Sequence, residues 1–132
     1  MSSLVLLLGR LLASAIFIQA GYSKLGDVGG TIVYLESTGV PSAGLVVWPV
    51  IALELLGGLA VLMGLLTRPV ALALAVFAIA AAAIGHSDYS SLMHFQAFMK
   101  DLAISGGYLF LAIHGPGALS LDAWLARGRA RT

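Results

Sequence analysis

The stretch AGLVVWPVIALELLGGLAVLMGLL, residues 43–66, decides the fold. A run of eighteen or more apolar residues is long enough to cross a bilayer as a helix. Its one ionisable residue is Glu54, close to the middle of the run. We therefore predict a membrane-spanning helix that carries a carboxylate inside the hydrocarbon layer.

The composition of the whole chain agrees with a membrane location. Of the 132 residues, 60% are hydrophobic and only 10% are charged, whereas soluble domains carry about 25% charged residues. The net charge of +1 gives no reason to expect a nucleic-acid partner. The absence of cysteine excludes disulfides, thiol exchange and thiolate metal sites. Electrons in any redox reaction must therefore travel through a bound cofactor or a partner protein.

Three further apolar segments, residues 4–22, 68–85 and 100–114, complete the expected set of spans. The predicted fold is an all-α integral membrane four-helix bundle, one domain over residues 1–132 with a tail at 115–132. The first segment is interpreted as a span rather than a signal peptide, because no basic residue precedes it and Arg10 interrupts it. The alanine-rich third span could pack against a second copy, which predicts a homo-oligomer.

The connections between the spans also have predicted structure. Residues 30–38 favour a short amphipathic helix that ends at Gly39. Residues 67–69 favour a tight turn, residues 86–99 a polar loop, and residues 120–132 a surface helix with a basic end.

Basic residues near the span ends predict the orientation. Four spans place both termini on one side together with Arg68, Arg127, Arg129 and Arg131. Lys24 and Lys100 fall on the other side. The positive-inside rule then predicts both termini in the cytoplasm.

Arg10 and Glu54 are the charges placed deepest in the predicted spans. A charge near the bilayer centre costs at least ~2.5–3.5 kcal/mol and usually faces a bundle interior or a polar cavity. The two residues differ in depth by roughly 9 Å at the helical rise per residue. This gap is compatible with a direct ion pair or with one bridged by water or a ligand.

Helical spacing places the polar residues of three spans on inward faces. The expected result is a cavity that opens toward the outer side of the membrane. We predict catalytic roles for Glu54 and Arg10. We predict ligand contacts for Lys24, Ser14, Asp101, Ser105 and Tyr108.

Structural interpretations of the same residues stand beside these. Arg10 and Glu54 could form a lock that fixes helix register. Lys24, Lys100 and Asp101 could be interfacial anchors. His86, Asp88 and His94 are expected to be ordinary loop polarity, with no metal site. Gly57-Gly58 and Gly106-Gly107 are expected to be close-packing positions between helices.

Short motifs in order along the chain carry a family resemblance. They are Arg10, GYSK (21–24), GVP (39–41), ELLGG (54–58), GLLTR (64–68), KDLA (100–103), GPG (115–117) and SLD (120–122). In these motifs the chain resembles the DoxX family of small bacterial inner-membrane proteins. The family's charged positions match Arg10, Lys24, Glu54, Arg68 and Lys100.

The resemblance implies a four-helix membrane bundle in the bacterial inner membrane and a link to redox metabolism. Relatives include a subunit of a thiosulfate:quinone oxidoreductase and proteins associated with oxidative and thiol stress. Some act within membrane-associated oxidoreductase complexes. A cysteine-dependent mechanism cannot apply to this chain, because it contains no cysteine.

The leading hypothesis is a redox-linked membrane subunit that binds a quinone or similar apolar ligand between its helices. Arg10 or Lys24 would donate to a carbonyl, Glu54 would exchange a proton, and Tyr108 would stack or donate. The alternatives are a non-catalytic scaffold for redox enzymes and a small proton-coupled transporter. Expected partners are membrane lipids and redox-enzyme subunits.

Overall fold

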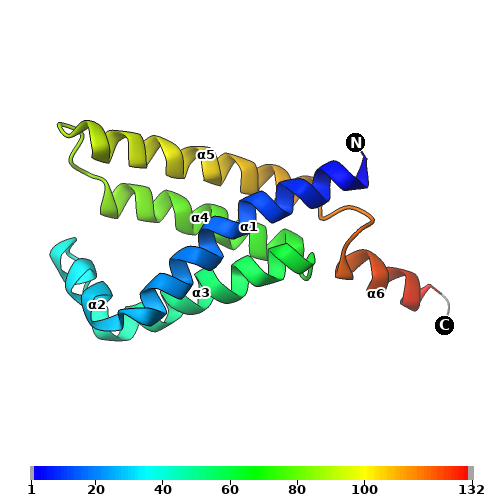
Figure 1. Cartoon of the computed structure of the whole chain (residues 1–132), viewed down its shortest axis with the longest axis horizontal. Helices are drawn as coiled ribbons and strands as arrows, with labels where there is room; N and C mark the ends of the chain where they lie inside the picture. Colours follow the sequence, from blue (N-terminus) through cyan, green and yellow to red (C-terminus); the bar gives the residue numbers. More distant parts are fainter. Residues whose placement is uncertain (1, 131–132) are drawn as a thin grey trace.

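A computed structural model describes residues 2–130, which form six α-helices and no strand (Figure 1). The helices are α1 (Ser3–Gly26), α2 (Val28–Ser37), α3 (Ala43–Met63), α4 (Thr67–Gly85), α5 (Leu92–His114) and α6 (Leu121–Arg129). Of these, α1, α3 and α4 are long and apolar enough to cross a membrane. The prediction of an all-helical membrane protein is confirmed. Arg131, counted among the basic residues of the tail, lies outside the described residues.

The long helices pack in two pairs. Helix α1 packs along α3, α4 packs along α5, and α3 also contacts α4 and so joins the pairs. Figure 1 shows α2 and the α4–α5 connection at one end of the molecule, and α6 with the start of α1 at the other. These two ends are called the α2 end and the α6 end below.

Two glycines allow α1 and α3 to approach closely. A Cβ added to Gly21 would lie 2.7 Å from the Leu55 backbone nitrogen, and one added to Gly58 would lie 2.8 Å from Ile18 Cγ1. The close-packing role predicted for Gly57-Gly58 is confirmed. The same prediction for Gly106-Gly107 is wrong, because a Cβ there would meet no atom of another residue within 4 Å.

Polar bonds between helices hold α5 against α1 and α4. The Tyr108 hydroxyl donates to the Ala13 carbonyl at 2.8 Å, and the Ser105 hydroxyl donates to the Ala75 carbonyl at 3.1 Å. The Tyr108 ring also meets Phe17 edge-on, with the ring centroids 5.3 Å apart. These bonds satisfy hydroxyls that could not otherwise be buried without cost.

Several boundaries differ from the sequence-based ones. Helix α5 begins at Leu92 rather than at Lys100, because its first turns, which are mostly apolar apart from His94 and Gln96, contain no glycine or proline to stop a helix. Helix α3 ends at Met63 rather than at Leu66, because Gly64 takes a left-handed conformation with φ of +70°. The short helix expected at 30–38 and the tail helix are both present, as α2 and α6.

Candidate functional site

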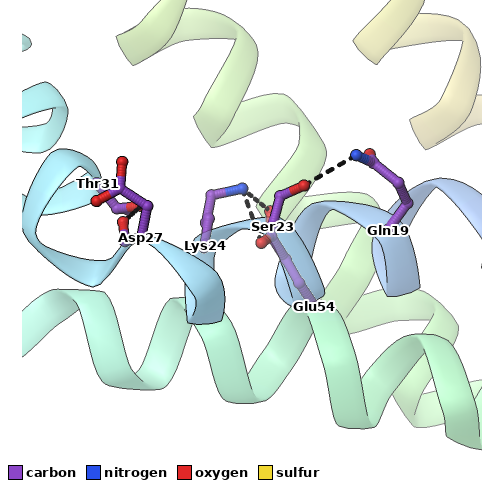
Figure 2. A network of polar contacts seen from close by, with 6 residues as sticks. All are labelled: Gln19, Ser23, Lys24, Asp27, Thr31 and Glu54. Carbon is purple, nitrogen blue, oxygen red and sulfur yellow. Dashed lines mark hydrogen bonds and ion pairs between the residues drawn. The ribbon is translucent and has the colours of Figure 1, made fainter.

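An ion pair between α1 and α3 lies near the α2 end. The Lys24 ammonium donates to Glu54 Oε1 at 2.9 Å and lies 2.8 Å from Oε2. Figure 2 shows the two side chains reaching toward each other between the helices. The Glu54 side chain is 6% exposed and that of Lys24 is 27% exposed, so the carboxylate is buried and the ammonium keeps an open side.

The helix register explains this pairing. The close approach of Gly21 to Leu55 and of Gly58 to Ile18 aligns α1 antiparallel to α3. This alignment places Glu54 level with Lys24 rather than with Arg10. The direct Arg10–Glu54 ion pair considered from the sequence is therefore wrong. The sequence-based estimate of their depths assumed that the predicted ends of the two spans lie at the same depth in the membrane.

A cavity of about 420 Å³ opens beside the ion pair. Lys24 and Glu54 line it together with residues of α2, α4 and α5. Much of the wall is apolar and includes Ile16, Phe17, Val50, Phe77, Ile84 and Ile104. A volume of this size and a mostly apolar wall with few polar groups are typical of small-molecule sites.

A second polar group lines the same cavity from the α4–α5 pair. His86 Nε2 lies 3.5 Å from Asp101 Oδ2, and Lys100 Nζ lies 3.7 Å from Asp101 Oδ1. All three residues are in the cavity wall. The inward position predicted for Asp101 is thus present, although its neighbours are His86 and Lys100 rather than Ser105 and Tyr108.

Arg10 lies far from this cavity, at the α6 end. Its side chain is buried, with 1% of the residue exposed, and Nη2 donates to the Leu119 carbonyl. The guanidinium occupies the space that a Cβ on Gly64 would need. Arg10 does not line the cavity, so its expected place beside Glu54 is corrected to a junction between α1, the α3–α4 turn and the segment before α6.

Asp122 belongs to the same junction. Its carboxylate accepts from the backbone nitrogens of Leu66 and Thr67 at 2.8 and 2.9 Å, and so caps the start of α4. Burial raises the pKa of Asp122, but hydrogen bonds from Thr67 and Leu66 and the charge of Arg10 outweigh it and hold that pKa below its ordinary value. The junction therefore favours a charged Asp122.

Three other residues predicted to contact a ligand are engaged elsewhere. Ser14 donates to the Leu11 carbonyl of its own helix, while Ser105 and Tyr108 hold α5 to its neighbours. None of the three lines the cavity. The inward faces predicted for them are correct, because all three are buried, but their hydroxyls bond to the backbone.

The histidine-containing loop has its own arrangement. Asp88 accepts from the Ser90 hydroxyl and amide, and these bonds lower the pKa of Asp88. The rings of His86 and His94 are 5.7 Å apart. No group of three or more metal-binding side chains is found within residues 2–130.

Helix α2 supplies lining residues that the sequence did not single out. Tyr34 of α2 and Thr38, which caps the end of that helix, are one turn apart and line the cavity. The Tyr34 hydroxyl lies 2.7 Å from the position of a Cβ on Gly85, so α2 reaches the end of α4. The four-residue spacing of Tyr34 and Thr38 indicates that both lie on one helix face. The sequence alone does not show which other helices that face meets.

Comparisons with known proteins agree on a family. The DoxX family model matches residues 5–87. The inner membrane protein YqjF of Escherichia coli (strain K12) is 47% identical over 116 residues, which cover 88% of each chain. The inner membrane protein YphA of the same organism is 32% identical over 123 residues, covering 89% of this chain and 88% of YphA.

A more distant relative is CatD of Bacillus subtilis (strain 168), whose name assigns it provisionally to the oxidoreductases. It is 29% identical over 131 residues, which cover 93% of this chain and 88% of CatD. No solved structure matches the chain.

Proposed function

The chain belongs to the DoxX family of multi-pass inner-membrane proteins, and on this premise we propose that it is a redox-linked subunit that binds a quinone or similar apolar ring in the cavity at the α2 end. The observation that carries the proposal is the Lys24–Glu54 ion pair in the wall of an otherwise largely apolar cavity. The provisional oxidoreductase name of the relative CatD supports a redox role.

The ion pair suits a carbonyl-bearing ring. Lys24 has three N–H donors, and the two Glu54 oxygens engage at most two of them. The third is available to a ligand carbonyl, while Glu54 can accept or deliver a proton. The apolar wall receives the ring, and its burial contributes roughly 25 cal/mol for each Å² removed from water.

Electrons have to come from outside the chain, because it contains no cysteine. We propose that a redox enzyme docks on the membrane subunit and supplies them. A non-catalytic scaffold would share this partner but would leave the cavity without a small molecule. The occupancy of the cavity therefore separates the two functions.

Native mass spectrometry of the protein in native lipid, with quinone extraction from the same sample, tests the proposal. We expect a stoichiometric quinone in the parent protein and its loss in Glu54→Gln. Ser23→Ala is the matched control, since Ser23 is next to Lys24 but is exposed, and its hydroxyl accepts from the Gln19 side chain rather than from the ion pair (Figure 2). A quinone retained by well-folded Glu54→Gln, or a parent protein free of ligand, would overturn the site.

We also propose that α5 is a fourth span and that both termini are cytoplasmic. The bonds from Tyr108 and Ser105 hold α5 beside α1 and α4, which are apolar enough to span. The charged residues Lys100 and Asp101 of α5 then lie toward the α2 end, where they line the cavity. Arg68, Arg127 and Arg129 gather at the α6 end, which favours the cytoplasm for that end.

The absence of cysteine makes this topology testable with single cysteines. We expect Ser87→Cys to react with an impermeant maleimide in intact cells and Ala118→Cys to react only after the membrane is opened. Labelling of both from outside would mean that α5 does not cross. The reverse pattern would invert the orientation.

A further inference from the structure

The two polar groups of the cavity come from different helix pairs. Lys24 and Glu54 belong to α1 and α3, whereas His86 and Asp101 lie at the end of α4 and on α5. Apolar residues of several helices, including Phe17, form much of the rest of the wall. A ligand that fills this space therefore meets polar atoms on two walls and apolar atoms between them.

Each polar wall has a donor with unused capacity: Lys24 on one wall and, on the other, His86 beside the more exposed ammonium of Lys100. Lys24 keeps one N–H beyond those facing Glu54. On the other wall, the buried His86 Nδ1 has no hydrogen-bond partner among residues 2–130, which leaves Nε2 as the ring nitrogen on the side of Asp101. The 3.5 Å between Nε2 and Asp101 Oδ2 exceeds a normal hydrogen bond, so an Nε2–H can be shared with a ligand.

Asp101 favours this role for His86. Its carboxylate beside Nε2 favours the tautomer that carries the proton on that nitrogen. Helix α2 closes the cavity from a third side through Tyr34 and Thr38. A ligand is thus held between two donors on separate walls.

We propose that the cavity selects a flat ring with an acceptor atom at each of two opposite ends, one bound by Lys24 and the other by His86. This inference rests on the proposed function and specifies its ligand class. A para-quinone has this pattern, whereas a ring with one carbonyl can satisfy only one wall. His86 would then help to decide which ring compounds bind, whereas the sequence-based interpretation made it an ordinary polar residue of a loop.

Three ring compounds of similar size provide the probes: 1,4-naphthoquinone with two opposite carbonyls, 1-tetralone with one, and tetralin with none. Binding is measured by equilibrium titration of the protein in lipid nanodiscs, with empty nanodiscs subtracted. One added hydrogen bond should make naphthoquinone bind about tenfold more tightly than tetralone. Thiol adducts do not interfere, because the chain has no cysteine.

The variants distinguish the two proposals. His86→Leu should bring naphthoquinone down to the affinity of tetralone, and His86→Gln, which keeps an N–H donor, should restore part of the ratio. His114→Leu is the matched control, since His114 is an exposed histidine whose ring bonds to the Phe110 carbonyl of its own helix. Naphthoquinone binding with an unchanged ratio in folded His86→Leu would overturn the two-ended site but leave the proposed function standing. No probe binding above empty nanodiscs would overturn both.

Discussion

Each end of the molecule holds a basic residue from the same face of α1, fully buried at the α6 end and half-buried beside a buried carboxylate at the α2 end. At the α6 end, Arg10 is enclosed by backbone and by the capped turn before α4. At the α2 end, Lys24 pairs with a buried carboxylate but keeps an open side toward a cavity. Burial of a charge is common to both ends, so it does not identify a site. What distinguishes the candidate site from the Arg10 junction is the cavity beside Lys24 and Glu54.

The largest expected loss of stability comes from removing the enclosed charge. Arg10→Met should lower the free energy of unfolding by about 3 kcal/mol, because it removes the bond to the Leu119 carbonyl and the charge that favours ionised Asp122. Unfolding by denaturing detergent in mixed micelles measures this. Naphthoquinone affinity of the folded protein should not change. A folded Arg10→Met that no longer binds the ring would instead place Arg10 in the site.

The next largest loss of stability is expected where α1 packs closely on α3, because this contact sets the register of the two helices. Gly58→Ala should cost about 2 kcal/mol, since the added Cβ meets Ile18 at 2.8 Å and the helices must separate. Separation also pulls Lys24 from Glu54, so ring affinity should fall as well. Gly106→Ala is the control, because its Cβ would meet nothing within 4 Å. Equal stability of the two variants would contradict the close packing of α1 on α3.

Much of the fold follows from local features that a sequence displays. Long apolar runs, the left-handed glycine at position 64 and the proline-bearing start of α4 all act within a few residues. The start of α5 was placed too late, because a segment near a span end that mixes apolar residues with a few polar ones, here His94 and Gln96, is compatible with either a loop or a helix that extends beyond the membrane. In the structure, residues 92–99 form the first part of α5, and Ser91 is the N-cap.

The candidate site was only partly predictable. The inward faces of Glu54 and Lys24 follow from helical spacing, and both residues line the cavity. Their pairing depends on the register of α1 against α3, which is set by contacts of Gly21 and Gly58 with residues far away in the sequence. His86 joins the site only because α4 and α5 bring it opposite those residues, and no spacing reveals that.

The third effect is smaller and depends on pH. Asp122→Asn should cost about 1 kcal/mol at neutral pH, as loss of a helix cap usually does. Because hydrogen bonds and Arg10 hold the pKa of Asp122 below its ordinary value of 3.8, its stabilising contribution is present above that value. The contribution is lost as the pH falls through the lower folded-state pKa.

Detergent unfolding of the parent and of Asp122→Asn at neutral and at strongly acidic pH checks the sign. The gap between the two proteins should close on acidification. A gap that widens there would mean that the pKa of Asp122 in the folded protein lies above its ordinary value of 3.8 rather than below it. Arg10→Lys, which keeps the positive charge, should leave most of the pH dependence intact.

The smallest change in stability is expected from removing the open pair as a whole. In Lys24→Met/Glu54→Met both charges are replaced by apolar side chains of similar length, and the free energy of unfolding should stay within about 1 kcal/mol of the parent. Either single variant should be less stable than the double variant, because it leaves one partner without its counter-charge. Ring binding should nevertheless be lost in the double variant, as measured in nanodiscs. A large loss of stability in the double variant would instead mean that the Lys24–Glu54 pair holds the fold together, as Arg10 does at the α6 end. A folded, stable and ligand-free double variant would show that this pair is maintained for the cavity rather than for the fold.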